Sequence, residues 1–252
     1  MDHNNTIERA GAVLRGAKRI VALTGAGVSR PSGIPDFRSG AGIWQRYNPA
    51  EVASLSAFQR NPRRFFEWFA PLLDAVQSAL PNAAHHALAG LERSGRLRAV
   101  ITQNIDSLHR RAGSREVFEL HGHIRTATCV ECGHQIPGDP VIRLMRLGQV
   151  PRCRCGGLIK PDIVLFDELL PRGLYWLARR AAETCDALIV AGTSLEVFPV
   201  SELPDVARRA GAKVIIVNQG ETYFDAQADV VLREDVAEAL PALAERAAGE
   251  PG

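Results

Sequence analysis

The sequence predicts an α/β protein, a doubly wound parallel sheet with a smaller insertion that carries helices and cysteines. Three observations support this fold class. Apolar runs alternate with helix-like segments, small or polar residues follow each apolar run, and four of the five cysteines lie together in a segment that breaks the alternation. Such alternation is typical of parallel sheets whose two faces are covered by helices.

Four apolar runs are the predicted strands of this sheet. They lack the alternation that marks a strand with one face in water, so we expect them to be buried on both faces. Helix-like segments at 83–94 and 201–210 lie between them, and a third at 234–247 contains Pro241, which is expected to kink or divide it. The runs are IVALT (20–24), AVIT (99–102), ALIVAG (187–192) and KVIIVN (213–218).

Each predicted strand ends in residues suited to holding a nucleotide. Because the carboxyl ends of parallel strands meet at one edge of the sheet, the four ends should form one ligand site. Glycines let the backbone approach a phosphate closely, and amides and hydroxyls supply hydrogen bonds. In order, the strand ends are Thr24-Gly25-Ala26-Gly27, Gln103-Asn104-Ile105-Asp106, Gly192-Thr193-Ser194 and Asn218-Gln219-Gly220.

The first of these ends opens a long loop, residues 25–44. A dinucleotide-binding turn has a third glycine where this chain has Arg30. The loop continues instead through five glycines, two prolines and the triplet Asp36-Phe37-Arg38. We therefore predict a nucleotide cradle covered by a long, polar and partly stiffened flap.

Bulk properties exclude several classes of function. A net charge of +2 is too small to predict binding to nucleic acid or to a membrane surface, and no apolar run is long enough to span a membrane. The polar N-terminal segment lacks the apolar core of a secretory signal. An odd number of cysteines with short spacings favours a metal site in a reducing compartment, so we expect a cytoplasmic protein. The expected oligomeric state is a monomer.

Four of the cysteines have the spacing of a zinc ribbon. Two residues separate Cys129 from Cys132, one separates Cys153 from Cys155, and twenty lie between the two pairs. The second pair is one residue shorter than the usual spacing. Four thiolates complete a tetrahedral shell and leave no position for water, so the single expected zinc ion is structural. Cys185, which precedes an apolar run, is expected to be a buried thiol that packs as a small hydrophobe.

Three polar residues are the candidates for catalysis. His121, in the segment FELHGH, carries an imidazole whose ordinary pKa lies near neutrality, so it can accept a proton from a hydroxyl without a metal. Asn104 and Asp106 follow a predicted strand and can hold a ribose or a polarised amide. An alternative interpretation is that they cap the next helix, and Asp106 can do both.

The order and combination of these motifs resemble the sirtuins, a family of NAD-dependent protein-lysine deacylases. The resemblance covers nearly the whole chain. Its motifs are GAGVSRPSGIPDFRS (25–39), TQNID (102–106), ELHG (119–122), the four cysteines, KPDIVLFDE (160–168), GTSLEVFP (192–199) and VNQGET (217–222).

The resemblance implies a fold and a reaction. A Rossmann-like NAD-binding domain would comprise residues 1–44, 81–124 and 161–252, with a helical module at 45–80 and a zinc-ribbon module at 125–160. The acyl oxygen of a modified lysine would attack C1′ of the nicotinamide ribose, and His121 would then act as general base on a ribose hydroxyl. The implied products are free lysine, nicotinamide and 2′-O-acyl-ADP-ribose, and the implied partners are acyl-lysine proteins or peptides.

The resemblance also matches residues to the two substrates. Phe37 would shield the reactive sugar from water and from returning nicotinamide. The peptide would add as a strand between two segments. One runs from Val164 to Leu169 and includes Phe166, Asp167 and Glu168, and the other runs from Glu196 to Pro199 and includes Val197 and Phe198. The residues matched to NAD are Gly25, Ala26, Gly27, Asp36, Phe37, Arg38, Gln103, Asn104, Asp106, Gly192, Thr193, Ser194, Asn218, Gly220 and Val236.

Two departures from the family pattern bear on specificity. Asp167 stands where the family commonly has glycine, and a carboxylate beside the peptide groove would favour basic substrates. Sirtuins that remove succinyl or malonyl groups carry a Tyr-x-x-Arg pair, whose positions here fall on Phe69 and Leu72. Because neither side chain offers a cation to a buried carboxylate, we expect acetyl-lysine, or longer apolar acyl groups, to be preferred over succinyl-lysine.

Two other functions stay open from the sequence alone. An ADP-ribosyltransferase would use the same activated sugar with a different acceptor, and the product, O-acyl-ADP-ribose or labelled protein, separates the two activities. A zinc-ribbon nucleic-acid binder with a vestigial nucleotide fold would need a basic face on the ribbon. The near-zero net charge argues against the second function.

Overall fold

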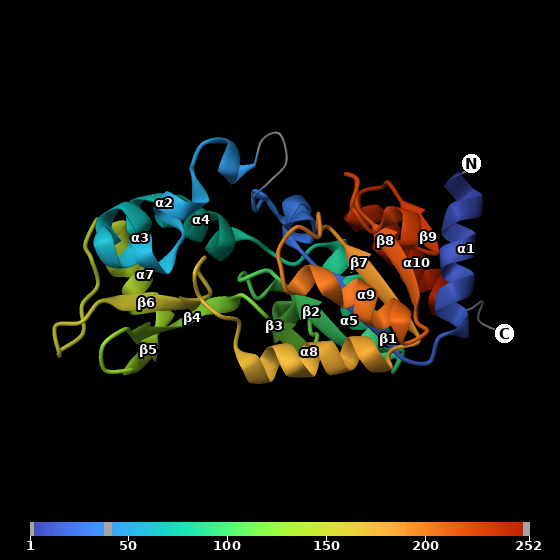
Figure 1. The fold of residues 1–252 in the computed structure, drawn as a ribbon. Coiled ribbons are helices and arrows are strands. Elements are labelled where there is room, and N and C mark those ends of the chain that lie inside the picture. The colour runs from blue at the N-terminus through green and yellow to red at the C-terminus, as the bar shows by residue number, and fades with distance from the viewer. Residues whose placement is uncertain (1–2, 38–41, 249–252) are drawn as a thin grey trace.

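The computed structural model describes residues 3–37 and 42–248, and it contains two sheets. The larger has six strands in the order β3-β2-β1-β7-β8-β9, and the smaller has three in the order β5-β4-β6. Figure 1 shows the two sheets side by side, each with its own helices, and the first and last helices, α1 (His3–Gly16) and α10 (Val236–Ala248), beside the larger sheet. Arg38, expected to contact NAD, lies outside the described residues.

The larger sheet is parallel in all of its pairings. The four predicted strands are confirmed, and the strand order reverses between β1 and β7, as in a doubly wound sheet. The edge strands β3 and β9 were not predicted, because three residues carry too little pattern. The strands are β1 (Ile20–Thr24), β2 (Leu97–Thr102), β3 (Val117–Glu119), β7 (Ala187–Ala191), β8 (Lys213–Val217) and β9 (Val230–Leu232).

Helices cover both faces of this sheet, which explains the continuous apolar runs. In β1, Ile20 and Ala22 pack into one core and Val21 and Leu23 into another, because successive side chains point to opposite faces. The first core includes side chains of α1 (His3–Gly16), α5 (Ala83–Arg93) and α10 (Val236–Ala248). The second includes side chains of α8 (Arg172–Thr184) and α9 (Leu203–Arg209), and Figure 1 shows α8 running along that face.

The helices depart from expectation at two points. Pro241 was expected to kink or divide the last helix, and it does not divide it, because α10 continues through it from Val236 to Ala248 while Leu240 and Leu243 anchor the helix in the core. Helix α8 was not predicted, because its fully buried positions are the alanines Ala178 and Ala182, which give only a weak apolar pattern.

The smaller sheet and its helices enclose a core of their own. The prediction that 45–80 is helical is confirmed by α2 (Pro49–Val52), α3 (Leu55–Arg60) and α4 (Pro62–Ser78). No strand was predicted in the segment 125–160, yet this segment takes part in an antiparallel sheet and adds a helix, and both pack against α4. These elements are β4 (Gly122–Cys129), β5 (Gln135–Pro137), β6 (Ile159–Ile163) and α7 (Gly138–Arg146).

Because the helical and cysteine segments share this core, we propose that they form one folding unit, the smaller unit, beside the larger unit formed by the six-stranded sheet and its helices. Short elements complete the described part of the chain. Across the described ranges, no helix is both long and apolar enough to cross a membrane. The short elements are the 3-10 turns η1 (Ala26–Ser32), η2 (Ile43–Gln45), η3 (Val200–Glu202) and η4 (Asp225–Gln227) and the helix α6 (Leu108–Arg111).

Candidate active site

A cavity of about 1040 Å³ lies over the carboxyl ends of β1, β2, β7 and β8 and extends to α4 of the smaller unit. It brings together His121 and every described residue matched to NAD or to the peptide. Besides His121, these residues are Gly25, Ala26, Gly27, Asp36, Phe37, Gln103, Asn104, Asp106, Val164, Phe166, Asp167, Glu168, Gly192, Thr193, Ser194, Val197, Phe198, Asn218, Gly220 and Val236.

The floor of the cavity is made by two glycine turns in close contact. The backbone N–H of Gly27 donates to the carbonyl of Gly192 at 2.8 Å. Gly192 has φ +60°, and a Cβ added there would lie 2.4 Å from the Val28 nitrogen. Small residues are therefore required at these strand ends by the packing of one turn on the other, as well as by any approaching phosphate.

His121 is held in one orientation at the edge of the larger sheet. Its Nδ1 lies 3.0 Å from the carbonyl oxygen of Gln103. Because a carbonyl can only accept, Nδ1 carries the proton of the neutral ring, and Nε2 is the basic nitrogen. Gly122, at φ +78°, turns the chain directly after it, and a Cβ there would lie 2.0 Å from the carbonyl of Asp162. The turn in ELHG thus requires its glycine.

Asn104 and Asp106 are tied to the nucleotide loop through Ser29. The Ser29 hydroxyl donates to Asp106 Oδ2 at 2.6 Å, and Asn104 Nδ2 donates to Ser29 Oγ at 3.1 Å and to the Gly25 carbonyl at 3.0 Å. Asp106 also accepts from the backbone N–H of Leu108, the first residue of α6, at 2.8 Å. The N-cap of α6 is Ser107, whose side chain makes no capping hydrogen bond, so Asp106 satisfies the start of the helix from one residue before the cap. Ser29 was not predicted as a site residue. Its position in the GAGVSRPS motif gave no sign of these partners, Asp106 and Asn104, which follow it by 77 and 75 residues.

Burial raises the pKa of the Asp106 carboxyl above its ordinary value. Hydrogen bonds from Ser29 and Leu108 oppose that effect, and the nearby charge of Glu119 adds to it. Only 6% of Asp106 is exposed. This carboxylate lies in a dry environment, where its charge acts strongly on a bound ligand.

The end of the cavity beside the smaller unit is apolar and aromatic. Phe37 stacks on Trp44 with ring centroids 5.2 Å apart, and Trp44 stacks on Trp68 at 5.6 Å. Phe69 and Leu72 of α4 are buried in the same wall. An aliphatic chain fits this chemistry, whereas an unpaired carboxylate does not.

The segment at 164–169 is fixed by backbone pairing to the helical segment. Phe166 donates to the Ala53 carbonyl, and the N–H of Leu55 donates to the Phe166 carbonyl, each at 2.9 Å. Asp167 has φ +72°, a conformation that favours glycine, and its carboxylate accepts from Ser56 Oγ at 2.9 Å. The hydrogen bond orients a side chain that relatives with glycine would lack.

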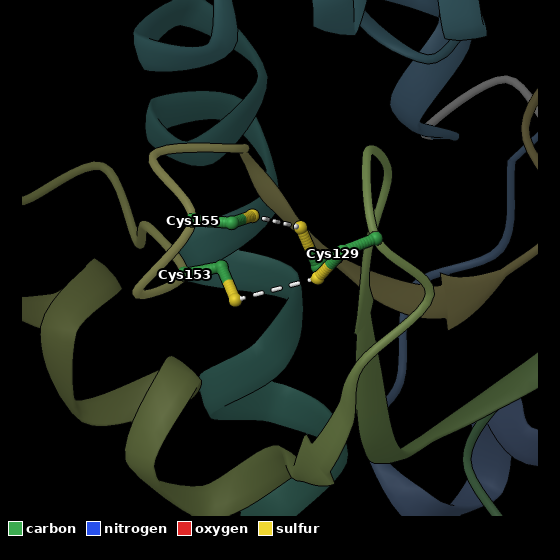
Figure 2. Close-up of side chains that lie close together, drawn as sticks. Cys129, Cys153 and Cys155 are labelled. Atoms are coloured by element: carbon green, nitrogen blue, oxygen red, sulfur yellow. Dashed lines mark hydrogen bonds between the residues drawn. The ribbon is translucent and has the colours of Figure 1, made fainter.

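The four clustered cysteines have the geometry of a metal site. Their sulfur atoms all lie within 4.8 Å of one another, with Cys129 3.5 Å from Cys155 and Cys132 3.8 Å from Cys153 (Figure 2). Four thiolates about 2.3 Å from one tetrahedral ion would lie about 3.8 Å apart, so the residues fit zinc. None of them lines the large cavity. Cys185 is buried as expected, and burial raises the pKa of its thiol to about 12.

Comparisons with known proteins agree with this geometry. A model of the Sir2 family matches residues 25–199. The "NAD-dependent protein deacylase 2" of Archaeoglobus fulgidus is 46% identical over 241 residues, covering 95% of each chain.

Solved structures extend the similarity to the fold. One described as "Structural Basis for the Mechanism and Regulation of Sir2 Enzymes" has a TM-score of 0.92 at 45% identity, covering 97% of this chain and 98% of the other. Sir2Af2 bound to a myristoylated histone peptide has a TM-score of 0.83 at 41% identity, covering 97% of both chains.

Proposed function

The chain belongs to the Sir2 family, and we propose that it removes acetyl and longer apolar acyl groups from protein lysine side chains while consuming NAD. The observation that carries this proposal is one cavity that holds a nucleotide cradle, an oriented imidazole and an apolar end. NAD would lie across the strand ends from Asn218 to Asn104. The acyl-lysine would enter between the segments at 164–169 and 196–199, with its acyl group toward Trp68.

The first step is a substitution at C1′ of the nicotinamide ribose. A bond forms between the acyl oxygen and C1′ as the bond from C1′ to nicotinamide breaks, so positive charge develops on the sugar. Asp106 and Asn104 orient the ribose and the nicotinamide amide, and the buried carboxylate stabilises the developing charge. Phe37 covers the sugar and excludes water, because its ring is held against Trp44.

The second step uses His121 as general base. Its Nε2 takes the proton of a ribose hydroxyl, and that oxygen then adds to the carbon of the imidate formed in the first step. The lysine nitrogen takes up the proton held by His121 and leaves as the amine. Water then adds to the acyl carbon, the bond from that carbon to the C1′ oxygen breaks, and the acyl group stays on the 2′ oxygen while C1′ keeps a hydroxyl. The products are free lysine, nicotinamide and 2′-O-acyl-ADP-ribose. The hydrogen bond from Nδ1 to Gln103 sets the tautomer that this step requires.

The metal site plays a structural part in this proposal. Cys129, Cys132, Cys153 and Cys155 would hold one zinc ion that joins the end of β4 to the loop before β6. The ion would supply no open coordination position, because four thiolates fill its shell.

Asp167 sets a preference for basic flanking residues in this proposal. Its exposed carboxylate lies at the mouth of the peptide cleft, where an arginine or lysine of a substrate would be attracted. The test compares peptides with basic and acidic flanks on the parent and on Asp167→Gly. An unchanged ratio of kcat/KM would refute the preference.

The proposed function is tested with an acetyl-lysine peptide and with the variant His121→Ala. Nicotinamide release by the parent should require both the peptide and NAD. His121→Ala should lose deacetylation by at least about 100-fold, because no other group takes the ribose proton, while exchange of labelled nicotinamide into NAD persists. Lysine release without NAD, or label transferred to protein, would refute the assignment, the latter in favour of an ADP-ribosyltransferase.

A further inference from the structure

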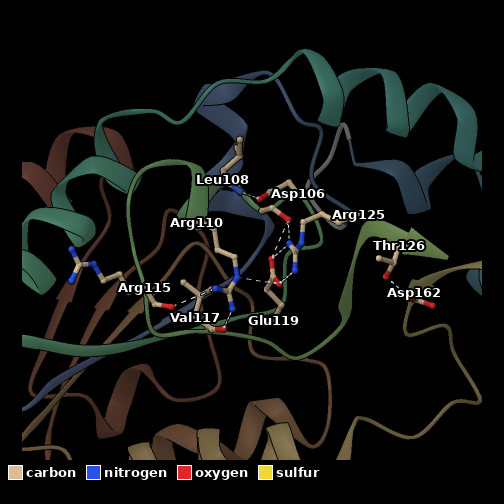
Figure 3. A network of polar contacts seen from close by, with 10 residues as sticks. Asp106, Leu108, Arg110, Arg115, Val117, Glu119, Arg125, Thr126 and Asp162 are labelled. Atoms are coloured by element: carbon tan, nitrogen blue, oxygen red, sulfur yellow. Dashed lines mark hydrogen bonds and ion pairs between the residues drawn. The ribbon is translucent and has the colours of Figure 1, made fainter. Parts of the chain in front are cut away.

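The buried side chain of Glu119 lies at the centre of a network of polar contacts that the steps above do not use (Figure 3). Its carboxylate accepts a two-pronged pair of hydrogen bonds from Arg125, at 2.8 Å from Nη1 and 2.6 Å from Nη2. Ser107 Oγ donates to it at 3.1 Å, and Arg110 Nε lies 3.4 Å away. The Glu119 side chain is 5% exposed, whereas that of Arg125 is 42% exposed.

The network keeps the Glu119 carboxylate charged although this side chain is buried. Burial alone would raise the pKa of the Glu119 carboxyl, but the hydrogen bonds and charge of Arg125, together with Arg110, lower that pKa below its ordinary value. Removing an arginine would leave the carboxylate poorly compensated, so the surrounding chain would shift to solvate it.

The partners come from segments that flank the proposed general base. Glu119 ends β3, two residues before His121, and Arg125 lies on β4, four residues after it. The ion pair therefore closes both sides of the tight turn at Gly122, and it joins the larger sheet to the smaller one. Ser107, which directly follows Asp106, ties the ribose side of the cavity to the same carboxylate.

We propose that Glu119 and Arg125 are positioning residues for His121, and that their ion pair fixes the turn and the sheet junction from which the imidazole reaches the ribose hydroxyl. This inference rests on the proposed function. It predicts that loosening the pair impairs the general-base step more than the loss of nicotinamide, because nicotinamide leaves before the imidazole acts.

The test uses Arg125→Lys and Arg125→Ala in the full chain, with an acetyl-lysine peptide. Lysine retains the charge but loses the two-pronged donor. Arg110 still faces Glu119 in both variants, and a thermal unfolding curve for each shows that it is folded at the assay temperature. We expect kcat for deacetylation to fall about tenfold in Arg125→Lys and further in Arg125→Ala, since small displacements of a catalytic group are costly. Nicotinamide exchange and the peptide KM should stay within about twofold of the parent.

A matched control is Arg146→Lys, on α7, whose arginine is 48% exposed and pairs with Asp74 of α4 at 2.6 Å, outside the cavity lining. It should leave both activities at parental values. A parallel fall of deacetylation and exchange in Arg125→Lys would show general structural support and overturn the proposal, as would no change in either. If the parent protein shows neither activity, the proposed function fails instead.

Discussion

Two opposing effects act on the pKa of the Asp106 carboxyl. The carboxylate accepts hydrogen bonds from the Leu108 N–H and the Ser29 hydroxyl, which favour the charged form, yet burial raises its pKa. The folded state therefore binds the proton more tightly than the unfolded chain does. The stability that this group contributes is fully present below its ordinary pKa of 3.8 and is lost as the pH rises through the raised pKa.

Asp106→Asn should separate stability from activity. The variant removes the charge that the site disfavours, so its unfolding temperature at pH 7.5 should equal or exceed that of the parent. Its nicotinamide release should fall about 100-fold, because the sugar loses its stabilising carboxylate. Calorimetry and a nicotinamide assay check this at the same pH. A variant that is both clearly less stable and fully active would contradict the assignment.

At the residue scale, the sequence predicted which side chains react better than it predicted which groups hold them in place. His121 was identified because an imidazole is one of the few groups that accept a proton near neutrality, and the structure adds the Gln103 carbonyl that fixes its tautomer. Ser29 and the Glu119 network could not be found, because a serine or a glutamate gains such a role only from partners distant in sequence.

At the scale of elements, a pair of buried histidines joins α5 and α6 to the end of β1. His85 and His109 are both within 1% of complete burial, with ring centroids 4.7 Å apart, and His109 Nε2 lies 2.9 Å from Thr24 Oγ1. Burial, with a smaller effect of His86, lowers the pKa of His85 to about 4. Burial also lowers the pKa of His109.

His85→Gln should make the protein less sensitive to acid. Because the pKa of His85 is lower in the folded state, neutral His85 contributes to the stability of the protein. This contribution is fully present above its ordinary pKa of 6.5 and is lost as the pH falls toward 4. Between pH 7.5 and 4.5 this loss amounts to about 2–3 kcal/mol. Glutamine can still accept the Asn82 N–H in the capping box, so α5 keeps its start. Urea unfolding at both pH values measures the difference. Equal losses in parent and variant would contradict it.

The cysteine knuckles are a second element with a direct test. Elemental analysis should find one zinc per chain, and Cys155→Ser should lower that content and the unfolding temperature together, because metal binding is part of the folding free energy here. Cys185→Ser is the control and should keep its metal, since Cys185 lies apart from the cluster. Full activity after complete removal of zinc from a folded protein would show that the site is dispensable.

The elements that could be predicted were those with a strong local pattern. The four central strands followed from unbroken apolar runs, and α5 lies within the helix-like segment predicted at 83–94. The strands β4 to β6 were missed, because their side chains pack against α4, more than forty residues earlier in the chain. Core membership of that kind depends on tertiary contacts and leaves little local signal.

At the scale of the whole molecule, both units contribute residues to the lining of the cavity. The larger unit supplies the strand ends, and α4 of the smaller unit supplies an apolar wall that includes Phe69 and Leu72. Of the described residues that line the cavity, the arginines are Arg30 and Arg172, and neither belongs to that wall.

This division of the cavity is tested with one peptide whose lysine carries an acetyl, a butyryl or a succinyl group. The kcat/KM for the succinyl form should be at least about 100-fold below the acetyl value, because a carboxylate would be buried without a partner, while the butyryl form stays active. Adding Phe69→Tyr and Leu72→Arg should raise succinyl turnover. Comparable turnover of succinyl and acetyl peptides by the parent would contradict the apolar wall.

The most direct test of the proposed function is the stoichiometry of a single reaction, followed by mass spectrometry. Acetyl-lysine peptide and NAD are mixed with the protein, and free lysine, nicotinamide and O-acetyl-ADP-ribose are quantified together. We predict that the three products appear in equal amounts and that none forms without NAD. Free lysine in excess of nicotinamide, with acetate as the other product, would contradict the claim that the acyl group leaves on the sugar.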